Sequence, residues 1–236
     1  MGVEDIEERS RSKIKKEADL YNDVIYFDDV QNSYFSLTTR TMRVFQYIVE
    51  QQYKFSYVLK CDDDTFPDVQ KIATELQNRE NPGRLYWGEF ITAFIKTEGK
   101  WKETHWSVCQ VYYPYAYGGG YILSGDLVHL IAENAPFLKK YNSEDVTVAS
   151  WVSAYNIERK HDVRFTTEVN PRGCKDVYTM VHKVATEKIT EHYLSLIHDG
   201  HICGPTNSWH GYDGYFYDWT AFPPSRKCCL YKSGIP

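Results

Sequence analysis

This sequence lacks several features that would assign it to a functional class at once. No run of about 18 apolar residues occurs, so we expect neither a membrane-spanning helix nor a signal peptide in the chain as given. No Cys-x-x-Cys spacing occurs, which argues against a zinc knuckle, and no Asn-x-Ser/Thr acceptor for N-glycosylation is present. An excess of positive charge is also missing: the net charge is −5, so we expect no nucleic acid as a partner.

The cysteines leave the redox compartment open. Six are present, and four of them, Cys174, Cys203, Cys228 and Cys229, lie beyond residue 170 in a stretch rich in glycine, proline and aromatic residues. A loop-rich segment of this kind gains stability from crosslinks, which favours an oxidising compartment. Buried free thiols in a cytosolic enzyme are the alternative, because cysteine also packs as a small apolar side chain.

The overall composition is that of a globular protein with a high content of aromatic rings. Hydrophobic residues make up 42% and charged residues 25%, which is ordinary for a folded domain with a substantial core. Aromatic residues reach 16%. Flat rings with polar tips are good surfaces for stacking sugars, but we expect most of them to fill the core and cover loops.

Apolar patterns alternate between short strands and longer helices along the chain. Strands are predicted at 24–27, 57–60, 85–87 and 121–123, and helices at 4–20, 36–52, 68–77, 127–133, from 144 onward, and at 185–197. The segment 91–117 is irregular and aromatic, and we expect it to form long loops or a short hairpin. This alternation predicts one α/β domain over residues 1–236, with a mainly parallel central sheet flanked by helices and a loop-rich C-terminal segment.

The run Asp62-Asp63-Asp64 directly follows the apolar stretch from Phe55 to Leu59. Adjacent carboxylates at the end of a buried strand repel one another unless a cation lies between them. Carboxylate oxygens suit hard divalent ions such as Mg²⁺ or Mn²⁺, and ligands bind at the open ends of strands in α/β sheets. The run therefore indicates a metal-assisted site for a phosphate-bearing ligand, with a solvated turn that caps the helix at Asp68 as the alternative.

Three further motifs are candidates for the same site, and each also has a purely structural explanation. Gly118-Gly119-Gly120 lets a ligand approach the backbone closely or forms a flexible turn, and it lacks the spacing of a dinucleotide-binding loop. Glu144 and Asp145 lie where a helix begins, so they supply a general base or cap the helix. His182 follows an apolar stretch and is either a metal ligand or a core histidine.

Several motifs in one order resemble the inverting β-1,3-galactosyltransferase family. They are YVLKCDDDTF, RLYWGEF, YYPYAYGGGYILS, NSEDVTVASW, HDVRF and YTMVHK, and the resemblance runs from about Val24 to Pro236. It implies a nucleotide-sugar transferase fold of the GT-A type, UDP-galactose as the donor and Mn²⁺ as the cofactor. It also implies residence in the Golgi lumen as a type II membrane protein, whose N-terminal anchor is absent from this chain.

The resemblance also implies a role for each candidate residue. Asp145 is the expected catalytic base, which takes the proton from the acceptor hydroxyl. The metal ligands are Asp64 and His182. The expected donor-binding residues are Asp62 or Asp63, which hold the ribose and the metal shell, together with Gly118, Gly119, Gly120 and Glu144.

Motifs near the C-terminus narrow the expected acceptor. RGC, YDW, a Cys-Cys pair and the final Gly234-Ile235-Pro236 are similar to the branch of the family that extends the glycosaminoglycan–protein linker. This likeness implies a galactosyl-xylosyl proteoglycan acceptor. Transfer of N-acetylglucosamine, or of galactose to a different acceptor, is the alternative.

The chain departs from the family pattern in two places. It begins after the βα unit that normally opens the domain, so we expect an edge of the nucleotide pocket to be absent. A catalytically silent fragment that binds the acceptor is therefore a further alternative. Ala149 also stands where the family often has glycine.

Overall fold

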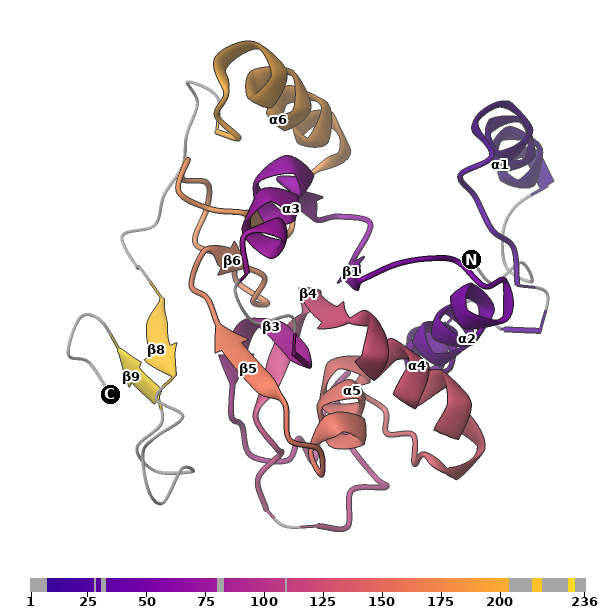
Figure 1. Ribbon diagram of the computed structural model, residues 1–236, viewed down its shortest axis with the longest axis vertical. Coiled ribbons are helices and arrows are strands. Elements are labelled where there is room, and N and C mark those ends of the chain that lie inside the picture. Colours follow the sequence, from indigo (N-terminus) through magenta and orange to yellow (C-terminus); the bar gives the residue numbers. More distant parts are fainter. Residues whose placement is uncertain are drawn as a thin grey trace.

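The computed structural model describes residues 8–27, 29–30, 33–79, 83–108, 110–203, 214–217 and 229–231 (Figure 1). Within these ranges the strands form one sheet of four, one of three and one of two. In chain order the elements are α1 (Glu8–Tyr21), η1 (Tyr34–Ser36), α2 (Leu37–Glu50), β1 (Tyr57–Cys61), β2 (Phe66–Pro67), α3 (Val69–Gln77), β3 (Leu85–Ile91), β4 (Tyr115–Ser124), α4 (Gly125–Asn134), η2 (Ala135–Phe137), α5 (Glu144–Val152), β5 (Glu158–His161), β6 (Phe165–Thr166), β7 (Met180–Val181), α6 (Thr186–Asp199), β8 (Tyr215–Tyr217) and β9 (Cys229–Tyr231).

The central sheet has the strand order β1-β4-β3-β5. The predicted α/β class with flanking helices is confirmed. The prediction of a mainly parallel central sheet is wrong for the described residues. In the described part of this sheet, β4 runs antiparallel to both of its neighbours, β1 and β3, and β3 pairs with β5 in parallel. The reason is that β4 returns between two strands that point the other way. The chain then crosses through α4 and α5 before it adds β5.

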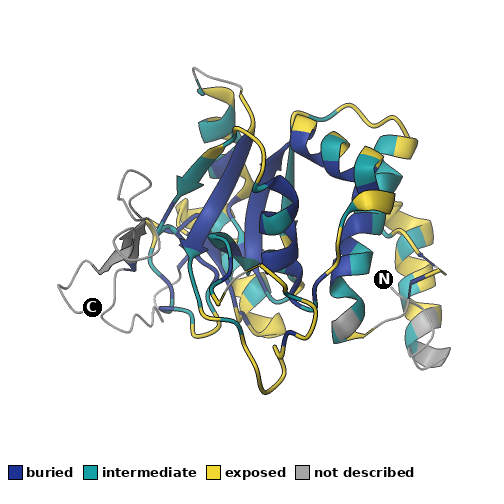
Figure 2. Ribbon diagram, turned by 90° about the horizontal axis from the view of Figure 1, so that it is seen from below, coloured by how far each residue is buried: buried dark blue, intermediate teal, exposed yellow. Residues whose placement is uncertain are grey.

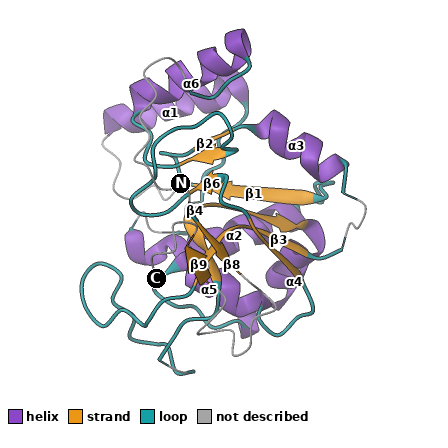
Figure 3. Ribbon diagram, turned by 90° about the vertical axis from the view of Figure 1, so that its left-hand side faces the viewer, coloured by secondary structure: helices purple, strands orange, loops and turns teal. Residues whose placement is uncertain are grey.

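Helices cover both faces of this sheet, as Figure 3 shows for α2, α4 and α5 on one side and α3 on the other. Alternate residues of a strand point to opposite faces, and β3 follows this rule. Tyr86 and Phe90 belong to the cluster formed with α2, α4 and α5, whereas Leu85 and Trp87 pack with Ile72 of α3. The strands at the centre are therefore buried on both sides (Figure 2).

A second, smaller sheet with the order β2-β7-β6 lies beside the carboxyl end of β1 (Figure 3). Asp68 follows β2 and caps α3, because its carboxylate accepts a hydrogen bond from the Lys71 backbone N–H at 2.9 Å. In the same region a disulfide joins Cys174 to Cys203, and both half-cystines are buried with Val181 of β7. This sheet positions residue 182, one of the predicted site residues, because that residue directly follows β7.

Most predicted helices form close to their expected bounds. The helix predicted from residue 36 is α2, and its apolar stripe packs on the sheet through Phe45 and Met42. The strand predicted at 24–27 does not form a ladder: Phe27 makes a single bridge, and its ring packs edge-on against Tyr47 of α2. Among the described residues, no helix is both long enough and apolar enough to span a bilayer.

Candidate active site

A cavity of about 150 Å³ lies where the carboxyl end of β1, the start of β4 and the N-terminus of α5 meet. Side chains from the loops at 99–103 and 167–169 complete its wall. The lining residues are Tyr34, Leu37, Lys60, Asp62, Lys100, Trp101, Tyr117, Gly118, Gly119, Glu144, Asp145, Thr167, Val169, His182 and Lys183. Charged side chains and aromatic or apolar side chains therefore both contribute to the wall.

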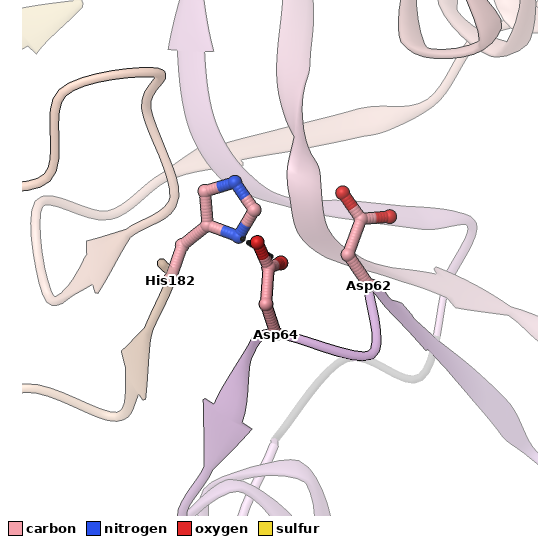
Figure 4. Close-up of side chains that lie close together, drawn as sticks. All are labelled: Asp62, Asp64 and His182. Atoms are coloured by element: carbon pink, nitrogen blue, oxygen red, sulfur yellow. Dashed lines mark ion pairs between the residues drawn. The ribbon is translucent and has the colours of Figure 1, made fainter. Parts of the chain in front are cut away.

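The acidic turn and the late histidine meet at one side of this cavity. Strand β1 ends at Cys61, and Asp62 then donates its backbone N–H to the carbonyl oxygen of Gly119 at 3.3 Å. One ligand atom each from Asp62, Asp64 and His182 lies within 4.8 Å of the others. Figure 4 shows these three side chains close together. His182 arrives here because Thr166 of β6 accepts a hydrogen bond from its backbone N–H at 3.0 Å.

These three side chains fit a divalent metal ion. Two carboxylates and one imidazole are a donor set that Mn²⁺ accepts. Burial lowers the pKa of His182, against the pull of Asp64 and Asp62, so the ring is neutral and has a lone pair for a metal at pH 7. His182 Nδ1 lies 3.1 Å from Asp64 Oδ1. The donors of the two residues therefore already converge.

Lysines balance the acidic charge around the triad. Lys183 Nζ lies 3.4 Å from Asp64 Oδ2, and Lys60 Nζ lies 2.6 Å from Asp62 Oδ1. Lys60 also donates a hydrogen bond to the Gly118 carbonyl oxygen at 2.5 Å and lies 3.7 Å from Glu144 Oε2. Burial alone would lower the pKa of Lys60, but the carboxylates of Glu144 and Asp62 raise it above the usual value. Lys60 thus links the acidic turn to the start of α5.

Asp145 lines the same cavity and is the second residue of α5. Its Oδ2 accepts a hydrogen bond from the Gly118 backbone N–H at 3.1 Å, and its Oδ1 accepts one from Val146 at 2.8 Å. Burial, followed by the charge of Glu144, raises the pKa of Asp145 from 3.8 to about 6. A carboxylate that binds its proton near neutral pH is suited to general base chemistry.

Glu144 is held more firmly than Asp145. Its side chain is buried, and the Tyr121 hydroxyl donates a hydrogen bond to Oε1 at 2.5 Å. With Lys60 near its other oxygen, both oxygens of Glu144 have partners. We therefore interpret Glu144 as the group that fixes Lys60 and raises the pKa of its neighbour.

The three glycines lie inside β4, not in a turn before it as one interpretation of the sequence had it. A Cβ at Gly118 would lie 3.3 Å from Asp145 Oδ2, and one at Gly119 would lie 2.8 Å from the His182 ring. Glycine at these two positions lets the base and the histidine approach the strand. Gly120 instead makes room for the Met180 thioether, and it does not line the cavity.

The structure brings most of the predicted site residues together. Asp62, Gly118, Gly119, Glu144, Asp145 and His182 line the cavity, and Asp64 joins them through the triad. Asp63 is exposed at the turn and does not line the cavity. Sequence reasoning did not single out Lys60, Lys100 or Trp101, although Lys60 stands two residues before the acidic run in a strand that is otherwise apolar.

A buried ion network supports the loop at 167–169. Arg172 is almost fully buried, and its guanidinium contacts Glu89 Oε2 at 3.1 Å and Glu168 Oε1 at 2.6 Å. It also donates to the backbone carbonyl oxygens of Val163 and Phe165. Burial and the charge of Glu168 raise the pKa of Glu89 well above the usual value, although Arg172 opposes this rise.

Comparison with known proteins agrees with this geometry. The sequence model described as galactosyltransferase matches residues 1–163. Mouse beta-1,3-galactosyltransferase 6 is 35% identical over all of this chain and 72% of its own length. Human UDP-GalNAc:beta-1,3-N-acetylgalactosaminyltransferase 2 is 30% identical over 63% of this chain and 30% of its own length. For the Arabidopsis hydroxyproline O-galactosyltransferase GALT6, the identity is 31% over 72% of this chain and 25% of the relative.

The observed fold and the sequence matches are consistent with the same protein family. A mixed α/β domain with helices on its sheets is consistent with a glycosyltransferase of the GT-A type. The match covers well over half of the chain and includes the acidic turn, the glycines of β4 and the start of α5. This chain therefore belongs to the galactosyltransferase family.

Proposed function

We propose that the chain transfers galactose from UDP-galactose, with inversion, to the 3-hydroxyl of a terminal galactose in the glycosaminoglycan–protein linker. The observation that carries this proposal is the pairing of two chemistries in one cavity. A donor set for a divalent ion, Asp62, Asp64 and His182, and a carboxylate with a raised pKa, Asp145, come together at this cavity.

The metal side would hold the donor. Asp64 and His182 are the proposed metal ligands, and Asp62 completes the donor set and is the proposed contact to the ribose. A bound Mn²⁺ would supply positive charge that stabilises the leaving diphosphate. Lys183, at the rim of the cavity, adds a second cation beside Asp64 for the same phosphates.

The base side would activate the acceptor. The acceptor 3-oxygen bonds to the anomeric carbon of galactose while the bond from that carbon to the UDP oxygen breaks, and the electron pair leaves on the diphosphate. The proton of the acceptor hydroxyl passes to the carboxylate of Asp145. Inversion needs one such base on the face opposite the leaving group, and it needs no covalent protein nucleophile.

The donor and acceptor are proposed from similarity as well as chemistry. Mouse beta-1,3-galactosyltransferase 6, which matches all of this chain over 72% of its own length, is a galactosyltransferase by name, and this supports UDP-galactose as the donor. The vertebrate N-acetylgalactosaminyltransferases support a second candidate, transfer of N-acetylgalactosamine. We also propose Golgi luminal residence as part of a type II membrane protein, as the family resemblance implies.

A transfer assay tests this function. The chain is given a galactosyl-xylose acceptor and, in separate reactions, UDP-galactose, UDP-N-acetylgalactosamine or UDP-N-acetylglucosamine, each with Mn²⁺ and again with excess chelator. We expect a β-1,3-linked galactose product that requires both UDP-galactose and the metal. Preference for another donor would replace the assignment of galactose, and full transfer in chelator would contradict the metal-assisted mechanism. Folded protein with no metal-dependent UDP binding by calorimetry would instead support a silent binding protein.

A further inference from the structure

The turn at residues 99–103 carries two side chains that no step above uses. Lys100 and Trp101 line the cavity together with Asp145, and the Trp101 side chain is 39% exposed. Gly99 adopts a φ of +73°, and its carbonyl oxygen accepts a hydrogen bond from the Lys102 backbone N–H at 3.1 Å. The backbone thus closes a tight turn that projects these two side chains at the cavity.

This turn is tied directly to the chain segment that precedes the proposed base. Glu103 is buried, and its two carboxylate oxygens accept hydrogen bonds at 2.8 Å from the backbone N–H groups of His105 and Asn142. The Asn142 side chain donates in return to the Lys102 carbonyl oxygen at 2.7 Å. Asn142 stands three residues before Asp145. The position of Trp101 is therefore fixed relative to the base.

A third element joins this side of the cavity. The Lys100 ammonium lies 4.5 Å from the ring centre of Tyr34, in η1, which is a cation–π contact. Burial, and next the charge of Asp145, raises the pKa of Tyr34 to about 12, so its hydroxyl keeps its proton at all physiological pH values. The Tyr34 side chain also hydrogen-bonds with Ser143, and Lys100 can donate a hydrogen bond to a ligand beside Asp145.

From this arrangement we infer that the 99–103 turn is the acceptor-binding element, with Trp101 as the surface on which the acceptor sugar stacks. The inference rests on the proposed function, in which the base faces the acceptor on the side away from the diphosphate. The turn is clamped to the base side by Asn142, whereas the metal donors come from the turn after β1 and from residue 182.

The chemistry of the turn selects the class of ligand. An indole ring offers a flat apolar face for the C–H groups of a hexopyranose, and it loses little conformational freedom on binding. The ammonium of Lys100 donates to sugar hydroxyls at the edge of that face. The ligand is thus an oligosaccharide that ends in a hexopyranose and presents one hydroxyl to Asp145.

The test compares Trp101→Ala with Trp101→Phe and with Phe94→Ala. Phe94 is a matched control, because it lies on the same connection between β3 and β4, is 74% exposed and does not line the cavity. We expect Trp101→Ala to raise the KM for a galactosyl-xylose acceptor about tenfold or more. Its calorimetric affinity for UDP with Mn²⁺ and its slow hydrolysis of the donor without acceptor should stay at the wild-type level. Trp101→Phe should recover most of the loss, and Phe94→Ala should not change the KM.

The outcomes separate this inference from the proposed function. An inactive wild-type chain would remove the function itself. An active wild type with an unchanged acceptor KM in Trp101→Ala would overturn the stacking role alone. A parallel loss of UDP affinity in that variant would overturn it too, since Trp101 would then serve the donor.

Glu103→Gln tests the positioning role of the clamp. Glutamine keeps one acceptor oxygen but turns an NH₂ group toward the second backbone N–H, so the hold on either residue 105 or 142 is lost. We expect the acceptor KM to rise by about threefold or more with the UDP affinity unchanged. Equal changes in the acceptor KM and in UDP affinity would indicate a general structural role instead.

Discussion

The Asp145→Asn variant should gain stability while it loses activity, because the folded protein holds this carboxylate at an energetic cost. A rise in pKa from 3.8 to about 6 corresponds to about 3 kcal/mol that the ionised form loses on folding. Asparagine removes the charge but turns an NH₂ group toward one of the two N–H donors, from Gly118 or Val146. The loss of that hydrogen bond destabilises the folded variant by about 1 kcal/mol or more. We therefore expect a net gain of about 1–2 kcal/mol in the free energy of unfolding at pH 7.5.

The sign of this effect can be checked through its pH dependence. The folded pKa lies above the unfolded one, so the destabilisation by Asp145 is fully present well above pH 6, declines as the pH falls below 6 and is gone below the unfolded pKa. At pH 5 about half of it remains. The advantage of Asp145→Asn over wild type should accordingly shrink by about 1.5 kcal/mol between pH 7.5 and pH 5.

Urea unfolding of the metal-free protein at the two pH values measures both quantities. Asp126→Asn is the matched control, because Asp126 is also the second residue of a helix and also accepts a hydrogen bond from the next backbone N–H, at 2.9 Å. Its side chain is half exposed and pairs with Arg84 at 3.3 Å, so its replacement should lower stability slightly or leave it unchanged. A stability difference for Asp145→Asn that does not change with pH, or that grows toward pH 5, would refute the reasoning.

The same variant tests the chemistry. Loss of a well-aligned base lowers transfer by about 10²-fold or more, and the affinity for UDP and Mn²⁺ should be retained because the metal donors lie elsewhere. Asp126→Asn should transfer at the wild-type rate. Unchanged turnover in Asp145→Asn would remove this residue from the mechanism, whatever its effect on stability.

Three other changes give separate outcomes. Asp64→Ala should abolish metal-dependent binding of UDP by calorimetry, and affinity that still responds to Mn²⁺ would remove Asp64 from the ligand set. Lys60→Met should shift the pH midpoint of kcat/KM upward from about 6, because the ammonium of Lys60 lowers the pKa of Asp145. A pH–rate profile that does not move would contradict this link between Lys60 and Asp145. Replacing Cys174 and Cys203 with alanine opens a loop with a sequence separation of 29 and should lower the free energy of unfolding by about 3–4 kcal/mol, whereas equal stability would show that the crosslink contributes little.

The sequence alone determined the local elements and the chemistry of the metal side. The apolar stripe of α2 and the cap at residue 68 predict helices, because helical periodicity and capping depend only on neighbouring residues. The triple aspartate after an apolar strand pointed to a divalent ion, because like charges at a strand end need a cation. The same local patterns predicted the wrong strand directions, since they carry no information on which strands pair.

The tertiary structure alone decided which of these groups form one site. The antiparallel ladder of β1 and β4 places Cys61 opposite Gly120, so the acidic turn meets the glycines of a strand that lies some sixty residues away. The small sheet then delivers His182, which stands 117 residues after Thr65, to hydrogen-bonding distance of that residue. The structure also showed that Lys60 and Trp101 belong to the site. Their positions relative to Asp145 are set by strand pairing and loop contacts between distant segments, which no short pattern in the sequence encodes.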